Sequence, residues 1–288
     1  MSWRNLLQYS VSESRIYQVT ALVLRARDYG EGHRLFSLFT REHGKVLAVA
    51  KGIKKPRAKL ASALQLLSLG EMQLATGRRF DVITQVHVIE SYYGLRTSMD
   101  AFAYASYFAE LFDESLEERQ HQPALFDLLS DALERVARGD APDLVARYVE
   151  ISLVAMLGYQ PHLLHCTQCL TPLARHDDEG RLQWPTWIGF SASQGGALCP
   201  NCQGNVPGAK RIAAGAVQVL HLLLVQGTDA LENLSISARL RREVESVMRD
   251  YLEYRLEKRL RSVRFLREWD EDGAASEKPF SLATSGEG

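Results

Sequence analysis

The sequence has few cysteines and no long apolar run, and each of these shortages excludes a class of protein. It also has almost no net charge. Four cysteines in 288 residues are too few for a disulfide-packed scaffold. The longest apolar stretch, residues 212–225, is interrupted by Gln218 and His221 and is shorter than the ~20 residues that span a bilayer. With 46% hydrophobic and 24% charged residues, the composition excludes a disordered or collagen-like chain and is typical of a globular protein.

The sequence motifs of common enzyme families are also missing. The chain contains no Walker-type Gly-rich loop, no G-x-G-x-x-G after a strand and no G-x-S-x-G elbow. His33, His43, His87 and His221 are scattered, without the spacing of a catalytic metal site. We therefore expect neither a nucleotide-driven motor nor a hydrolase, and no catalytic residues.

The first fifteen residues, MSWRNLLQYSVSESR, do not resemble a secretory signal, which has a basic region, an apolar run and a small-residue cleavage site. We expect a cytoplasmic protein with no membrane partner. In that reducing compartment, paired thiols more often bind metal than form disulfides.

Charge is distributed unevenly along the chain. The net charge of −1 combines fourteen basic and seven acidic residues in positions 1–93 with 20 basic and 28 acidic residues in positions 94–288. Such an asymmetry points to an anionic partner for the first part.

The length of the chain also exceeds what one compact core usually takes, which predicts two domains or one domain with an added module.

Hydrophobic periodicity predicts an α+β multidomain protein. Five short β-rich segments with Gly-containing turns between them favour a small antiparallel barrel, and five strands fit an OB-fold; they are 17–24, 35–40, 46–50, 70–76 and 82–89. Helical spacing follows in 101–118, 124–137, 142–157, 209–225 and 237–267. We therefore expect an OB-fold domain over 1–93, a helical domain over 94–160 and 208–269, a module inserted at 161–207, and a disordered tail over 270–288.

All four cysteines of the chain fall into one pattern, Cys166-x-x-Cys169 and Cys199-x-x-Cys202. Two residues between thiolates let both point at one ion, and two such knuckles complete a tetrahedral shell that suits Zn²⁺. Four thiolates leave no open position, so the pattern predicts one structural zinc ion per chain and not a catalytic one. Reduced buried thiols or two disulfides are the alternatives, and His162 and His165 are expected to lie outside the ligand set.

Residues 51–59, KGIKKPRAK, carry five cations and no acid, and Gly52 and Pro56 prevent a helix there. Such a cluster suits phosphate contacts. The predicted DNA-binding residues are Lys51, Lys54, Lys55, Arg57, Lys59, Arg34, Arg78 and Arg79. Tyr29, Phe36 and Phe80 are candidates for base stacking. For these aromatics a structural role is the favoured interpretation, since Phe36 alternates with Leu35 and Leu38 as a core residue does. The alternative for the lysine run is a solvated loop.

The segment 239–261 has apolar residues on one helical face and many arginines. It predicts a packed amphipathic helix. Its arginines either cover a solvated face or, around an apolar notch, hold an acidic peptide.

The order of these features resembles the RecO family of bacterial DNA repair and recombination mediators, over residues 15 to 267. The resemblance rests on VLRARDYGEGHRLFSLFT at 23–40, GKVLAVAKGIK at 44–54 and YRLEKRLRS at 254–262, together with the position of the Cys₄ module inside a helical domain.

The resemblance implies an N-terminal OB-fold, a helical domain with a zinc-finger-like insertion, and no catalytic centre. It implies binding of single- and double-stranded DNA and annealing of complementary strands by a nucleoid-associated protein. Family members act with RecR, and often RecF, to load RecA onto DNA coated by single-stranded DNA-binding protein (SSB), and their helical domain contacts the acidic C-terminal tail of SSB. Two other functions stay open: a zinc-dependent nucleic-acid hydrolase and an adaptor that binds only proteins.

Overall fold

The computed structural model describes residues 16–54, 60–176, 179, 182–258, 260–262 and 266. The predicted tail over 270–288 lies outside them. The chain divides into two compact units, one of residues 1–96 and 109–140 and the other of residues 97–108 and 141–288. Helix α1 (Met99–Ser115) contributes residues to both units.

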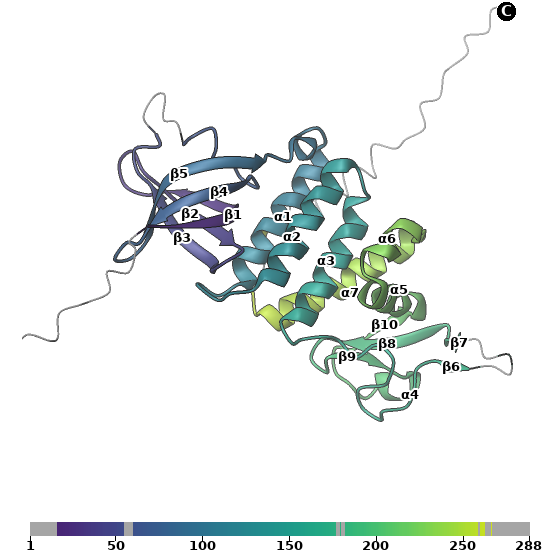
Figure 1. The fold of residues 1–288 in the computed structure, drawn as a ribbon. Coiled ribbons are helices and arrows are strands. Elements are labelled where there is room, and N and C mark those ends of the chain that lie inside the picture. The colour runs from purple at the N-terminus through teal and green to yellow at the C-terminus, as the bar shows by residue number, and fades with distance from the viewer. Residues whose placement is uncertain are drawn as a thin grey trace, which may run out of the picture. The chain divides into compact units, whose positions relative to one another are not determined.

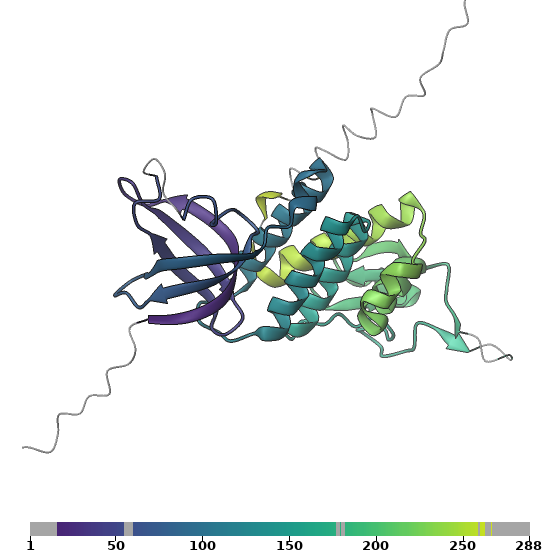
Figure 2. The same ribbon diagram turned by 45° about the horizontal axis from the view of Figure 1, so that its top comes forward.

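The five predicted strands form the closed barrel of the first unit (Figures 1 and 2). The strands are β1 (Ile16–Asp28), β2 (Arg34–Thr40), β3 (Gly44–Ala50), β4 (Leu69–Ala75) and β5 (Asp81–Glu90). They pair in the order β1-β2-β3-β5-β4, and β4 returns to β1 to close the barrel. The short parallel pairing of β3 with β5 is the exception to the antiparallel pattern. The fold class predicted from periodicity is therefore confirmed.

Alternation along the strands fills the barrel, because successive side chains point to opposite faces. The interior holds Val19, Ala21 and Val23 from β1 and Phe36 and Leu38 from β2. Strand β2 is buried on its other face as well, since Phe39 packs against Phe126 with ring centroids 5.5 Å apart.

The helices of the first unit follow the barrel strands in sequence and are attached to them by buried polar groups. After the 3₁₀ turn η1 (Tyr93–Arg96) come the end of α1 and α2 (Pro123–Arg138). The buried hydroxyl of Ser37 donates to Asp113 Oδ1 at 2.6 Å. Asp81, only 2% exposed, accepts hydrogen bonds from Tyr17 and, at 2.6 Å, from Arg119 in the α1–α2 connection.

The second unit packs α3 (Pro142–Met156), α5 (Ala214–Gln226) and α7 (Ala238–Leu256) against one another, with the short α6 (Thr228–Asn233) beside α3 and α5. Two predicted helices are shorter than their patterns indicate. Residues 210–213 of the expected helix 209–225 form strand β10. The expected helix 237–267 breaks after Leu256, where Glu257 adopts a left-handed conformation with φ +52°.

The inserted module contains a small sheet of its own. Strands β8 (Trp187–Ser191), β9 (Gly196–Leu198) and β10 (Lys210–Ala213) pair in the order β10-β8-β9. A hairpin of β6 (Arg175–His176) and β7 (Leu182–Gln183) precedes them, and the short helix α4 (Pro200–Gln203) follows β9. The module attaches to the helices through Phe190, whose ring contacts that of Tyr251 on α7 at 5.9 Å.

The Tyr17–Asp81–Arg119 contact gives the first prediction. Burial, followed by the hydrogen bond to Asp81, raises the pKa of Tyr17 to about 12. A raised folded-state pKa stabilises the fold fully below the unfolded value near 10, and this stability is lost as the pH rises from 10 to 12. Tyr17→Phe should therefore lower the free energy of unfolding by about 1–2 kcal/mol at pH 8, and the difference should shrink toward pH 12. Urea unfolding of both proteins at pH 8, 10 and 11.5 measures this difference in the free energy of unfolding. A difference independent of pH would contradict the raised pKa of Tyr17.

Candidate nucleic-acid interface and metal centre

Register places three of the predicted DNA-binding cations at one end of the barrel. Arg34 begins β2 and pairs across the ladder with Ala50, the residue before Lys51. The turn that follows β3 is attached to the β1–β2 loop, because the backbone nitrogen of Lys54 donates to the Gly32 carbonyl at 3.3 Å. Lys51, Lys54 and Arg34 are all exposed.

One carboxylate lies among these cations. Asp28 forms an ion pair with Lys54 Nζ at 2.7 Å and a longer one with Arg34 Nε at 3.4 Å. The hydrogen bond from Lys54, with the charges of Lys54 and Arg34, lowers the pKa of this exposed carboxyl. Asp28 is therefore charged at neutral pH and offsets part of the positive charge at this end of the barrel.

The β4–β5 hairpin brings two further cations to the same end. Arg78 and Arg79 are exposed at its tip, and the guanidinium of Arg79 lies 5.0 Å from the centroid of the Phe80 ring. Phe80 in turn contacts the ring of Tyr29 in the β1–β2 loop, edge to face, at 5.6 Å. The structure thus brings together five of the predicted cations; Lys55, Arg57 and Lys59 lie outside the described residues.

Three other cations of the first unit already pair with carboxylates of the same unit. Arg25 lies 3.1 Å from Asp113 Oδ2, and Arg41, in the β2–β3 turn, lies 3.0 Å from Asp127 Oδ1. Arg119 pairs with Asp81. At the end of the barrel Arg34 and Lys54 share Asp28, whereas Lys51, Arg78 and Arg79 form no ion pair among the described residues, so this end keeps cations available to an outside anion.

The four cysteines are brought together by backbone contacts between their two knuckles. In the first knuckle, Leu170 N donates to the Cys166 carbonyl at 2.9 Å; in the second, Cys202 N donates to that of Cys199 at 3.1 Å. Thr167 N donates to the Ala197 carbonyl on β9, which attaches the first knuckle to the strand that leads into the second. Gly196 is required beside it, because a Cβ there would lie 2.2 Å from the His162 carbonyl oxygen.

The resulting cluster fits a metal ion. The Sγ atoms of Cys166, Cys169, Cys199 and Cys202 all lie within 4.8 Å of one another. Those of Cys169 and Cys199 are 3.7 Å apart. A tetrahedral ion with metal–sulfur bonds of about 2.3 Å spaces its ligand sulfurs by roughly 3.8 Å, so the thiols stand at the spacing that a shared ion needs.

The thiols differ in how readily they ionise. Hydrogen bonds from the side chain and backbone of Thr171 lower the pKa of Cys169 to about 6. Hydrogen bonding with Cys199 and Cys169 raises the pKa of Cys202 to about 12. A metal ion would displace the protons that the cluster otherwise shares, which makes metal binding weaker at acid pH.

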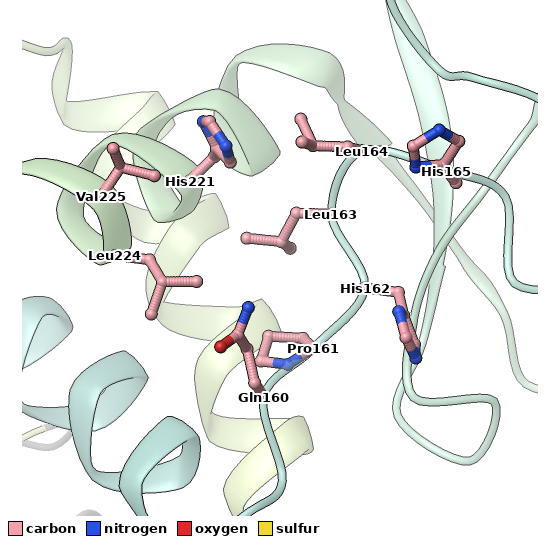
Figure 3. A pocket seen from close by; sticks show the side chains of 9 residues that line it. All are labelled: Gln160, Pro161, His162, Leu163, Leu164, His165, His221, Leu224 and Val225. Carbon is pink, nitrogen blue, oxygen red and sulfur yellow. The ribbon is translucent and has the colours of Figure 1, made fainter.

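The nearby histidines stand apart from this cluster. His162, His165 and His221 line a separate pocket of about 240 Å³ between the segment 160–165 and α5. Figure 3 shows Leu163 directed toward α5, whereas His162 lies on the other side of the segment. Among the described residues, the only group that could hold a metal consists of the four cysteines, as the spacing predicts.

Helices α3 and α7 enclose a charged cluster that the sequence reasoning missed. Arg147 and Glu150 of α3 are buried and 2.6 Å apart, and the Tyr107 hydroxyl donates to the same carboxylate oxygen at 2.6 Å. Burial raises the pKa of Glu150 to about 7, although Arg147 acts against this. Arg147 Nε has no partner within the described part of the chain. The sequence feature that could have indicated this cluster is an Arg and a Glu three residues apart in a mainly apolar helix.

A cavity of about 460 Å³ adjoins this cluster. Arg147 lines it, and Arg241 and Arg242 of α7 stand at its side, Arg241 bonded to Asp143 at 2.8 Å. The apolar part of its lining consists of Leu144, Ile236, Val244 and neighbouring residues. Arg241 and Arg242 of the amphipathic helix thus stand beside a partly apolar cavity that is also lined by the carboxylates of Asp100, Asp143 and Glu245. The interpretation of this helix as a peptide site stays a prediction.

Comparison with known proteins finds a match for the barrel segment of the chain and another for the segment that follows it. Residues 15–92 match the family model "Recombination protein O N terminal" and residues 96–264 match "Recombination protein O C terminal". The chain belongs to the RecO family. It is 35% identical to the DNA repair protein RecO of Pelotomaculum thermopropionicum, covering 91% of this chain and 98% of that protein. It is also 35% identical to that of Symbiobacterium thermophilum, over 87% and 96% of the two chains.

The curated RecO relatives are named DNA repair proteins, and this chain spans nearly their whole length. The family assignment confirms the resemblance recognised in the sequence. Within the described residues, the structure contains no helix long and apolar enough to cross a bilayer.

The cysteine geometry predicts metal in the purified protein. We expect one divalent metal ion per chain, and Cys199→Ser should lose it and unfold at a lower temperature, because metal binding free energy contributes to folding. Elemental analysis of freshly reduced protein and a thermal melt measure both effects. His165→Ala is the matched control and should keep the ion. Metal-free wild-type protein, or a His165→Ala variant that loses the ion, would contradict the site.

Proposed function

We propose that this RecO family member is a DNA-annealing recombination mediator in DNA repair. The observation that carries the proposal is the group of cations Lys51, Lys54, Arg34, Arg78 and Arg79 at one end of an OB-fold barrel. Two complementary strands repel each other through their phosphates. Cations that neutralise phosphates on both strands lower this repulsion, so that base pairing can begin.

This proposed function requires no catalysis. The Cys₄ cluster would hold Zn²⁺, for which four sulfur ligands are the common structural set, and such a filled shell has no position for a substrate. Its role would be to stiffen the module that packs on α7 through Phe190. Phosphate contacts set affinity without reading sequence, which suits a protein that must act on any damaged region of the chromosome.

As partners we propose those of the family: single- and double-stranded DNA, RecR, SSB, RecA and, in some settings, RecF. RecR and SSB would bring the protein to SSB-coated DNA, where RecA is then loaded in the cytoplasm.

A specific observation favours the second unit as the binding site of the SSB tail. An acidic peptide with an apolar C-terminal residue needs an apolar notch and cations for its carboxylates. The cavity beside α3 and α7 offers Leu144 and Val244 for the first need. For the second it offers Arg242 and, in exchange for its present bond to Asp143, Arg241.

The barrel surface predicts a change in the salt dependence of DNA binding. Replacing Lys51, Lys54 and Arg79 by Ala should weaken binding to single-stranded DNA and reduce the slope of log K against log salt by about 0.7 per lost contact, or roughly 2 in all. Fluorescence anisotropy of a labelled oligonucleotide between 50 and 250 mM NaCl measures the slope. Complementary-strand annealing, with and without SSB, should slow in parallel, and the labelled strands should keep their length when Mg²⁺ or Zn²⁺ is added.

Two single variants control this experiment. Arg41→Ala removes one charge at the opposite end of β2, where Asp127 already pairs with it, and should leave the slope unchanged. Asp28→Asn removes the carboxylate that holds Lys54 and Arg34 and should tighten binding. An unchanged slope in the triple variant would remove this surface from the proposal, shortened strands would favour a hydrolase, and no binding by the wild type would favour a protein-only adaptor.

The cavity beside α7 predicts which arginines the SSB tail needs. Arg241→Ala combined with Arg242→Ala should weaken the binding of a labelled SSB-tail peptide by about ten-fold or more, since charge-assisted hydrogen bonds contribute about 1.5–3 kcal/mol each. Arg239→Ala, on the same helix but outside the cavity lining, is the control. Amidation of the peptide carboxylate should weaken wild-type binding in the same way. Equal effects of the double variant and Arg239→Ala would place the tail elsewhere.

A further inference from the structure

Two aromatic side chains meet among the cations at the end of the barrel. The rings of Tyr29 and Phe80 are in edge-to-face contact, with centroids 5.6 Å apart and planes at 89°. They belong to different turns, the β1–β2 loop and the β4–β5 hairpin, and neither ring is part of the barrel core. Tyr29 is 42% exposed although it is a large, mainly apolar side chain.

Both turns hold their aromatic residue in a fixed place. In the hairpin, Gly77 N donates to Asp81 Oδ1 at 3.1 Å, and a Cβ on Gly77 would lie only 1.9 Å from the Phe80 carbonyl oxygen. In the loop, Tyr29 N donates to the His33 carbonyl at 3.1 Å, and His33 Nδ1 accepts a hydrogen bond from Gly52 N at 2.9 Å. The backbones that carry the two rings are thus held by these contacts, and the rings themselves are placed by their contact with each other and by that of Phe80 with Arg79. A platform held in this way loses less conformational freedom on binding.

The cations nearest to the rings are suited to a strand that lies on them. Arg79 stands over the Phe80 ring at 5.0 Å. Asp28, next to Tyr29 in the chain, forms ion pairs with Lys54 and Arg34. Phosphates on these cations would place the attached bases beside the aromatic pair, which is the combination that sequence-independent single-strand sites use.

We propose that Tyr29 and Phe80 form a stacking platform for unpaired nucleobases, which makes this end of the barrel bind single strands in preference to duplex. The inference rests on the proposed DNA-binding function and adds the base contact to its phosphate contacts. Bases in a duplex are stacked on their neighbours and unavailable to the platform. A single strand can give up a base to it, and is released when pairing with a complementary strand restacks that base.

An abasic oligonucleotide tests the platform, because it keeps the phosphates and lacks the bases. Wild-type protein should bind oligo(dT) more tightly than an abasic strand of the same length, by between about 5-fold and 150-fold per stacked base. Tyr29→Leu combined with Phe80→Leu should reduce the affinity for oligo(dT) to that for the abasic strand. The affinity of this variant for the abasic strand and the salt slope should not change. Anisotropy titrations at several salt concentrations provide all of these values.

Tyr93→Leu is the matched control, since this ring of the same unit is 72% exposed and lies after β5, outside the cation group. It should bind both strands as the wild type does, and Tyr29→Phe, which keeps the ring, should retain most of the preference. Equal binding of both strands by the wild type would overturn the platform whether or not the double variant folds. If the wild type binds neither strand at low salt, the proposed DNA-binding function itself fails.

Discussion

Ion pairing within the first unit decides which of its cations are available to an outside anion. Asp81 and Asp113 are buried and engage Arg119, Arg25 and Lys45. A charge that is already neutralised contributes little to an outside field, and at physiological salt the remainder is screened within about 8 Å. The barrel is basic by composition, and the cations of the proposed DNA surface, which pair with no buried carboxylate, lie where β2 begins, where β3 ends and in the β4–β5 hairpin.

The proposed DNA surface would combine two contacts that differ in range and selectivity. Phosphate contacts act at a distance and accept any strand, which makes encounter fast. A ring contact acts only at van der Waals distance and depends on whether the base is free. A protein that must hold strands until they pair, and then release the product, needs the first contact for capture and a second that weakens on pairing.

The second unit obtains its order in a different way. Among the described residues of 160–208 few large side chains are buried, and Ile188, Phe190 and Leu198 form only a thin layer in the small sheet. Burial of this size offsets little of the conformational entropy that ordering such a segment costs. A metal ion in the Cys₄ cluster would supply the missing constraint, since it would join two knuckles that are some thirty residues apart in the chain. Helices α3, α5 and α7 have an apolar core and can accept a buried Arg147–Glu150 pair.

The sequence by itself determined what depends on local spacing. The strands and most helices follow from periods of two and 3.6 residues, and each C-x-x-C pair forms a knuckle whose geometry lies within four residues, so that the two pairs together predict a cluster that could hold a metal. The tertiary structure alone decided which cations Asp28 and Asp113 neutralise, that Tyr29 meets Phe80, that Arg147 is buried, and that residues 210–213 pair with β8. Each of these joins residues distant in the chain, and local preferences carry no information about which long-range contacts the closed barrel and the packed helices will form.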